Sequence, residues 1–184
     1  MFKQKVLFTK EECREILNEI EEVKQAKVIS ERGASGYGKS FRKSKISHFN
    51  SDKVKEIILP KISSIDSTII SLPKIINIVK YNKGDYFKIH ADSSDGVYEK
   101  RLKTLIIQLS DNTYNGCILK VYKNTTNHIC SSEIGNTIIF DSTCKHEVTP
   151  MLKGERYALV CWLEKNNLHY KQTMPTQAFT TCHK

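Results

Sequence analysis

The pattern of apolar and polar positions predicts a first helix near the start of the chain. Thr9 and Glu12 frame a capping box, in which the Thr9 hydroxyl bonds the third helical N–H and Glu12 reaches back to the cap. Apolar residues then fall on one helical face: Cys13, Ile16, Leu17, Ile20 and Val23. We expect this helix to pack against a sheet from outside and to carry no chemistry.

A second helical stretch follows and contains a proline. Its apolar positions are Val54, Ile57, Ile58, Ile62, Ile65 and Ile69. Because proline has no N–H and its ring clashes with the preceding turn, either the helix kinks at Pro60 or a second helix begins there. Residues 30–48, before this stretch, lack periodicity and contain Gly33, Gly36 and Gly38. They predict a mobile loop or a hairpin.

From residue 75 onward the pattern becomes that of strands separated by glycine and Asn/Asp clusters. The predicted strands are Ile75–Tyr81, Tyr86–His90, Arg101–Leu109, Cys117–Tyr122, Asn136–Phe140 and Glu155–Leu163. Both faces of the third and of the last strand are apolar, which is typical of central strands that are covered on both sides.

Helices first and short strands afterwards predict an α+β fold, with a double-stranded β-helix (jelly-roll) core and N-terminal helices packed outside it. The 184 residues are most simply one domain. We expect residues 1–74 to support the core, residues 75–163 to form it, and residues 164–184 to be a strap or a tail.

Composition narrows the class of protein. No apolar run approaches the length of a membrane span, and the start of the chain shows no secretory signal. The six cysteines form no CxxC pair, so they predict neither a disulfide framework nor a zinc site. We therefore expect a cytoplasmic or other reducing compartment and no membrane partner.

The net charge of +9 comes almost entirely from lysine, because only five of the 29 basic residues are arginine. The lysines are spread over many segments, which favours a solvated basic surface. The functional alternative is an acidic or nucleic-acid partner.

The chemistry is concentrated around His90 and Asp92. On a strand, residues i and i+2 point to the same face, so these two side chains can reach one ion while Ile89 faces away. A third ligand must come from a distant strand, and His146 is the candidate. Two imidazoles and one carboxylate form the facial triad that holds non-haem Fe(II) and leaves coordination positions open.

A basic residue lies ten positions beyond His146. Arg156 shares a strand face with Ala158, Val160 and Trp162, where a guanidinium is costly unless it is paired. A carboxylate ligand would supply that partner through a two-pronged contact. The alternative is a salt bridge at the beginning of the strand. Trp162 is interpreted as a core residue, with a stacking platform as the alternative.

The string from Tyr81 to Tyr157, with its His-x-Asp, His146-Glu147-Val148 and Gly154-x-Arg156 segments, resembles the iron(II)- and 2-oxoglutarate-dependent dioxygenases, in their prolyl 4-hydroxylase-like branch. The resemblance covers roughly residues 75–163. It departs from the family at Gly116-Cys117, where the family often has two glycines, and at Arg156, where many prolyl hydroxylases have lysine.

The resemblance implies roles for individual residues. His90, Asp92 and His146 would be the iron ligands. Arg156 would bind the distal carboxylate of 2-oxoglutarate, with Tyr81 and Thr104 lining that pocket. Gln108 joins the candidate pocket because it shares a strand face with Thr104, and Arg42 is a candidate substrate contact because loops in that region close over substrate in the resembling enzymes.

The resemblance also implies a reaction: hydroxylation of an unactivated C–H bond with dioxygen. The cofactors would be Fe(II), 2-oxoglutarate as co-substrate, and ascorbate. The expected substrate is a prolyl residue of a peptide or protein, and a free amino acid is the alternative. A nucleic-acid demethylase is disfavoured because Trp162 stands where such enzymes carry a second arginine. A non-catalytic basic binding module on the same fold is the alternative from another class, although the intact triad argues against it.

Overall fold

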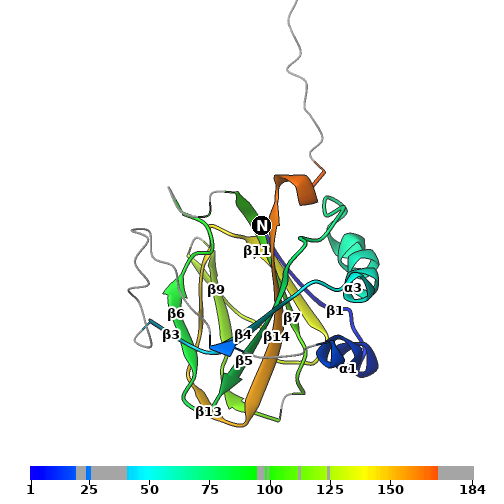
Figure 1. Cartoon of the computed structure of the whole chain (residues 1–184). Coiled ribbons are helices and arrows are strands. Elements are labelled where there is room, and N and C mark those ends of the chain that lie inside the picture. Colours follow the sequence, from blue (N-terminus) through cyan, green and yellow to red (C-terminus); the bar gives the residue numbers. More distant parts are fainter. Residues whose placement is uncertain are drawn as a thin grey trace, which may run out of the picture.

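The structure is a computed structural model of the whole chain, and it describes residues 1–19, 24–25, 41–94, 98, 100–111, 113–123 and 125–169. Two antiparallel sheets lie face to face, and two helices cover the outer face of the larger sheet (Figure 1). The predicted α+β jelly roll is therefore confirmed. No helix in the described part of the chain is long and apolar enough to cross a membrane.

The larger sheet has seven strands and the facing sheet has five. The order in the larger sheet is β1 (Phe2–Val6), β11 (Asn136–Asp141), β7 (Arg101–Gln108), β14 (Glu155–Glu164), β5 (Ile76–Asn82), β4 (Lys45–Phe49) and β2 (Lys24–Gln25). The order in the smaller sheet is β10 (Thr126–Ile129), β9 (Leu119–Lys123), β12 (Lys145–Val148), β6 (Tyr86–His90) and β3 (Arg42–Lys43). A short pair, β8 (Asn115–Gly116) and β13 (Met151–Lys153), closes one end.

Both predicted helical stretches are present, and the first begins at its predicted cap. Helix α1 (Lys10–Asn18) has the complete Thr9 capping box, and it buries Cys13 and Ile16. Ile20 and Val23, which were expected on the same face, lie outside the described residues. Helix α3 (Asp52–Ile65) starts at the Ser51 cap and runs through Pro60 as one helix.

Pro60 does not end α3 because it lies on the exposed side of the helix. The carbonyl that loses its helical partner there can be solvated, which limits the cost of the proline. Ile69 does not belong to this helix. It is buried in a connecting segment, where it pairs with Leu168.

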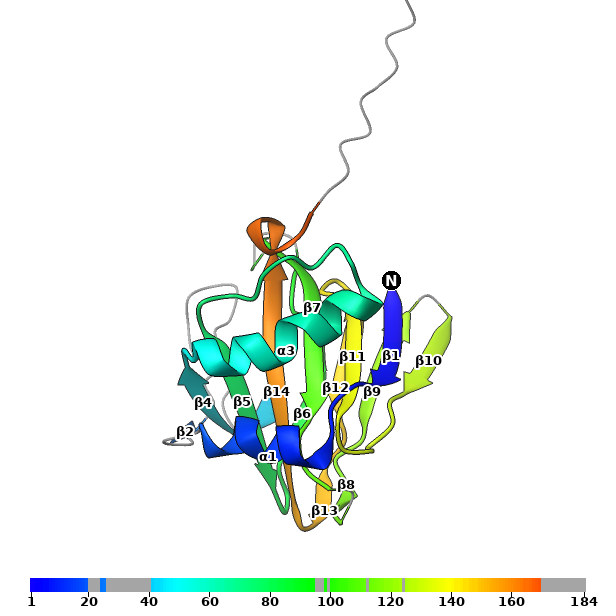
Figure 2. The ribbon, with the colours of Figure 1, turned by 90° about the vertical axis from the view of Figure 1, so that its right-hand side faces the viewer.

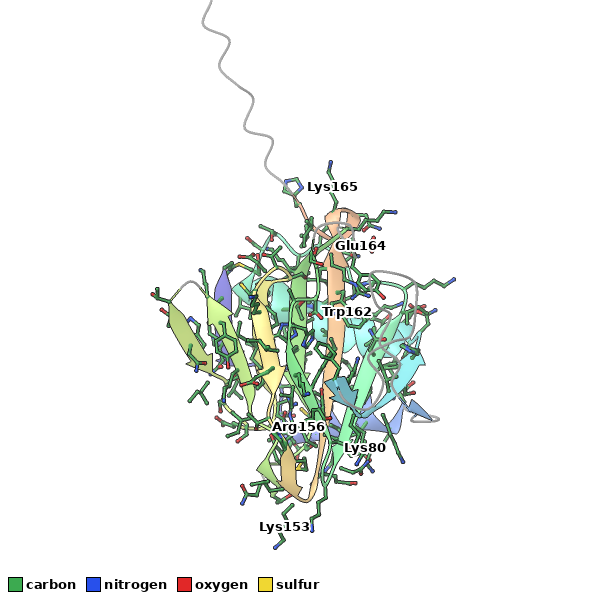
Figure 3. All side chains as sticks on the ribbon, turned by 90° about the vertical axis from the view of Figure 1, so that its left-hand side faces the viewer. Lys80, Lys153, Arg156, Trp162, Glu164 and Lys165 are labelled. Carbon is green, nitrogen blue, oxygen red and sulfur yellow. The ribbon has the colours of Figure 1, made fainter. Side chains whose placement is uncertain are left out.

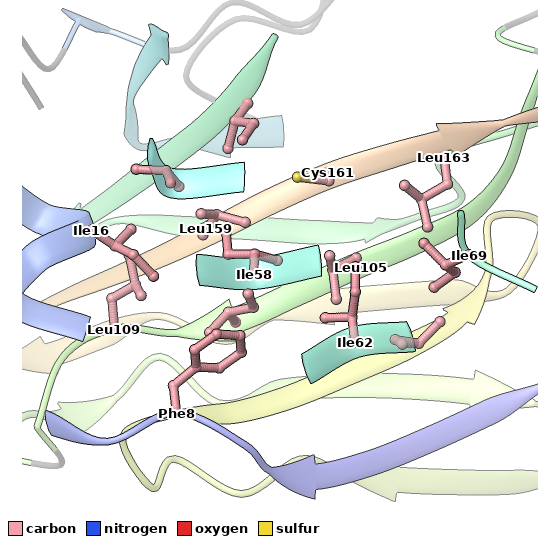
Figure 4. Packing of buried hydrophobic residues seen from close by; sticks show 14 of the residues in the cluster. Phe8, Ile16, Ile58, Ile62, Ile69, Leu105, Leu109, Leu159, Cys161 and Leu163 are labelled. Atoms are coloured by element: carbon pink, nitrogen blue, oxygen red, sulfur yellow. The ribbon is translucent and has the colours of Figure 1, made fainter. Parts of the chain in front are cut away.

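Two apolar layers lie on the two sides of the larger sheet. Strand β14 shows both, because Leu159, Cys161 and Leu163 pack against α1 and α3, whereas Ala158 and Val160 face the other sheet. Figure 2 shows the two helices lying across the larger sheet, and Figure 4 shows side chains of the first layer. The second layer is the interior of the jelly roll, where the candidate site lies.

Residues 41–49 differ from the predicted loop or hairpin. Strand β3 pairs with β6 and strand β4 pairs with β5, so the chain crosses from one sheet to the other at Ser44, which is buried. The rest of the predicted loop, residues 30–40, lies outside the described residues.

The described end of the chain packs against the domain. The 3-10 helix η1 (Lys165–Asn167) is followed by Leu168, and the Asn167 side chain donates to Ser71 Oγ at 3.1 Å. Residues 170–184, the remainder of the predicted strap or tail, lie outside the described residues.

Candidate metal centre and carboxylate pocket

His90 reaches the interior of the jelly roll through an irregularity in β6. His90 pairs with His146 of β12, whereas Phe87 pairs with Val148, so β6 uses one more residue than its partner between these pairs. Such a bulge turns two successive side chains, here Lys88 and Ile89, to the exposed face. It therefore lets both Phe87 and His90 point inward, where their rings stack at 3.5 Å.

The structure brings His90, Asp92 and His146 together. One ligand atom from each lies within 4.8 Å of the others. The Nε2 atoms of His90 and His146 lie 3.7 and 3.5 Å from the two carboxylate oxygens of Asp92. All three face one point, as metal ligands must.

The imidazoles are oriented by backbone carbonyls. His90 Nδ1 lies 2.8 Å from the Lys88 carbonyl oxygen, and His146 Nδ1 lies 3.1 Å from that of Cys144. A carbonyl only accepts, so Nδ1 carries the proton in both rings and Nε2 keeps its lone pair for a metal. His90 Nε2 is buried and has no hydrogen-bond partner within the described part of the chain. A metal ion fits this donor set.

The pKa shifts of His146 and Asp92 also favour the binding of a cation. Burial lowers the pKa of His146, which favours the neutral imidazole that binds metals. Burial opposes ionisation of Asp92, but His146, His90 and the Thr104 hydroxyl outweigh it and hold the pKa of that carboxyl below its usual range.

Asp92 is fixed by contacts with the larger sheet. The Thr104 hydroxyl donates to Asp92 Oδ2 at 2.7 Å and lies 3.0 Å from Ser142 Oγ. The backbone N–H of Asp92 donates to the Ser142 carbonyl at 2.9 Å. Thr104 was expected beside the co-substrate, but it contacts Asp92, the candidate metal ligand. The contact of Ser142 with Asp92 was not predicted from the sequence.

Arg156 lies near the start of β14 (Figure 3). Its side chain is buried, with only 4% of its surface exposed. Its Nε donates to Gln108 Oε1 at 2.7 Å, and its guanidinium lies 5.7 Å from the centre of the Tyr81 ring. Among the described residues, no carboxylate forms an ion pair with Arg156, so the predicted alternative of a salt bridge is not observed.

A pocket of about 490 Å³ adjoins this guanidinium. Its lining includes Gln108, Tyr114, Cys117, Leu119, Cys130 and Arg156. Tyr81 is buried beside Arg156, and burial raises the pKa of its phenol to about 12. A buried guanidinium that has no carboxylate partner among the described residues can bind a ligand carboxylate in the adjoining pocket.

Two further arginines flank the candidate metal site. The Arg42 guanidinium lies 4.4 Å from the centre of the Phe87 ring, which in turn stacks on His90. Arg101 lies between Tyr98 at 3.7 Å and Trp162 at 3.9 Å. Arg42 was predicted as a substrate contact.

The arrangement of Arg101 and Trp162 was not predicted. Trp162 is half-buried and pairs in register with Thr104, so the indole lies beside the metal-site strand. Its Nε1 is buried without a partner in the described residues. The interpretation of Trp162 as a plain core residue was therefore incomplete, and its position on the Arg156 face was the available signal.

Comparisons with known proteins agree with this geometry. The sequence profile of the 2OG-Fe(II) oxygenase superfamily matches residues 76–164. A PKHD-type hydroxylase of Shewanella sp. (strain MR-7) is 29% identical over 97 residues, which are 50% of this chain and 42% of that protein. The chain thus spans about half the length of the curated relatives that it matches.

Solved structures show the same fold. A Pseudomonas putida prolyl-4-hydroxylase has a TM-score of 0.70 at 18% identity, over 89% of this chain and 91% of that one. The viral collagen prolyl hydroxylase of Paramecium Bursaria Chlorella virus-1, solved as a 2OG complex, has a TM-score of 0.64 at 18% identity, over 88% and 94%. Residues 76–164 contain all three candidate metal ligands and Arg156, and this region has the sequence profile of the 2OG-Fe(II) oxygenase superfamily.

Proposed function

We propose that this chain is an Fe(II)- and 2-oxoglutarate-dependent dioxygenase that hydroxylates a prolyl residue of a peptide or protein. The observation that carries the proposal is the convergence of His90, Asp92 and His146 on one point. Iron held there would couple the oxidative decarboxylation of 2-oxoglutarate by dioxygen to hydroxylation of the substrate.

Each part of the site has a task in this reaction. His90, Asp92 and His146 would hold the metal and would leave coordination positions open for 2-oxoglutarate and dioxygen. Arg156 binds the distal carboxylate of 2-oxoglutarate, because a planar guanidinium matches a carboxylate with two parallel hydrogen bonds. Gln108 accepts from the guanidinium Nε, and the guanidinium also interacts with Tyr114 and Cys117, which line the pocket.

The residues around the metal site support a peptide substrate. Phe41 packs edge-on against Phe87 at 5.8 Å and against His90 at 6.2 Å, and this apolar surface suits the ring of a proline. Arg42 and Arg101 are held over aromatic rings, and their N–H groups can donate to backbone carbonyls of an extended peptide. A related fold from Trichoplax adhaerens was solved as a prolyl hydroxylase with a peptide fragment.

The test is mass spectrometry of products. The protein is incubated with Fe(II), 2-oxoglutarate, ascorbate and dioxygen, together with proline-containing peptides or free amino acids. We expect one oxygen to be added to a prolyl residue, with an equal amount of succinate formed. The Asp92→Ala variant, which lacks one ligand, should yield neither product.

The possible outcomes separate the alternatives. Oxygen addition only to a free amino acid would replace the proposed substrate and keep the reaction. A protein that binds metal and 2-oxoglutarate but forms no succinate with any substrate would refute the enzymatic function and favour a binding module.

A further inference from the structure

A strained turn aims Cys117 into the pocket beside Arg156. Gly116 and Cys117 both have a positive φ, of 79° and 53°. At Gly116 an added Cβ would lie 2.3 Å from the Pro150 carbonyl oxygen, so only glycine fits there. The Cys117 N–H donates to that same carbonyl at 3.1 Å, which fixes the left-handed conformation of a residue that has a side chain.

This turn directs the thiol inward. Cys117 is 1% exposed, belongs to the apolar layer between the two sheets, and lines the pocket next to Arg156. The thiol and the guanidinium interact electrostatically, because each appears among the influences on the other's pKa. A glycine would satisfy the backbone better and would leave this space empty, so the side chain itself takes up room beside the cation.

The thiol takes up this room without adding a charge. Burial raises the pKa of Cys117, although Arg156 opposes that change. The side chain therefore stays neutral at neutral pH, and the positive charge of Arg156 remains available for a carboxylate.

We propose that Cys117 sets the length of the dicarboxylate that this pocket accepts, by filling the space beside the guanidinium into which a longer ligand would extend. The proposal rests on the proposed function of Arg156. It makes Cys117 a specificity-determining residue for the co-substrate.

The experiment compares two dicarboxylates that differ by one methylene. Binding of 2-oxoglutarate and of 2-oxoadipate to the Mn(II)-loaded protein is measured by calorimetry for the wild type, Cys117→Gly and Cys117→Ala. One methylene in a fitted pocket is worth roughly tenfold or more in affinity, so we expect the preference for 2-oxoglutarate to fall by about tenfold in both variants.

Two variants serve different purposes here. Glycine relaxes the backbone at φ 53°, whereas alanine keeps the constraint and removes only the sulfur, so agreement between them assigns the effect to the side chain. Cys161→Ala is the matched control, because Cys161 is a buried thiol in the apolar layer on the helical side. It should leave the preference unchanged.

The outcomes distinguish this inference from the function on which it rests. An unchanged preference in both Cys117 variants, with 2-oxoglutarate still bound, would overturn the role of Cys117 and leave the proposed function standing. A wild-type protein that binds Mn(II) but not 2-oxoglutarate would overturn both.

Discussion

At the scale of single residues, Arg156 is a buried cation that lacks a carboxylate partner among the described residues. Replacing it with alanine should weaken 2-oxoglutarate binding by about thirty- to several-thousand-fold, because losing a buried charge-assisted pair costs about 2–5 kcal/mol. Arg156→Lys keeps the charge but loses the planar fork, so its affinity should be intermediate. Calorimetry on the Mn(II)-loaded protein measures both, and wild-type affinity in Arg156→Ala would refute the assignment.

Thr104 offers a test of the metal site that leaves every ligand in place. Its hydroxyl donates to Asp92 Oδ2 at 2.7 Å. Thr104→Val keeps the shape and removes this bond, and losing such an outer contact typically weakens metal binding by about 10–100-fold. Thr104→Ser keeps the hydroxyl and should restore most of the affinity. Equal Mn(II) affinity in the valine variant and the wild type would show that Thr104 does not orient Asp92.

At the scale of elements, two glycines with nearly the same backbone make a matched pair. Gly135 and Gly84 have φ of 78° and 82°, so alanine at either position costs about 1–2 kcal/mol of conformational strain. At Gly135 the added Cβ would also lie 1.9 Å from the Phe8 carbonyl oxygen, whereas at Gly84 it meets only the end of Lys43 at 3.6 Å.

Gly135→Ala should therefore be the more destabilising substitution. The clash involves backbone at the junction of β1, α1 and β11, where Gly135 also donates to the Gln108 carbonyl at 2.8 Å. We expect the free energy of unfolding to fall by at least about 2 kcal/mol more in Gly135→Ala than in Gly84→Ala. Denaturant unfolding measures the difference. Equal decreases in the free energy of unfolding would show that the backbone at this junction shifts at little cost to make room for the Cβ.

The elements that could be predicted from the sequence are those whose signal lies in the residues of the element itself. Helix α1 begins at a capping box that four consecutive residues define, and β7 and β14 are apolar on both faces. Strand β1 was not predicted, because its Lys3, Gln4 and Lys5 show no alternation. It forms by pairing with β11, about 135 residues away along the chain, with Phe2 opposite Phe140.

Some residues of the candidate site could likewise be predicted from the sequence, and others could not. The His-x-Asp spacing, the later His146 and the isolated Arg156 gave four candidate site residues from the sequence. The contacts of Ser142 with Asp92 and of Arg101 with Trp162 could not be predicted, because they depend on the register between distant strands. The bulge after Phe87 could not be predicted either, because nothing in the sequence of β6 indicates that this strand uses one more residue than its partner.

At the scale of the whole molecule, the candidate metal site joins the two sheets. His90 and His146 lie on neighbouring strands of the smaller sheet, and Asp92 is hydrogen-bonded to Thr104 of the larger one. An ion bound by all three residues would therefore hold both sheets together. It would stabilise the fold as a whole, because it binds the folded chain and finds no assembled site in the unfolded one.

We predict that Mn(II) at one hundred times its dissociation constant raises the melting temperature by about 5–10 °C. This follows from a gain of about 2.7 kcal/mol at that saturation and from about 2–4 °C per kcal/mol for a chain of this size. His146→Ala should abolish the shift while the variant remains folded without metal, since only one side chain is lost. His128→Ala is the control, because His128 is half-buried on β10 and stacks on Phe2 away from the triad, and it should keep the full shift. A shift that survives in His146→Ala would place the stabilising ion elsewhere and remove the link between the metal and the two sheets.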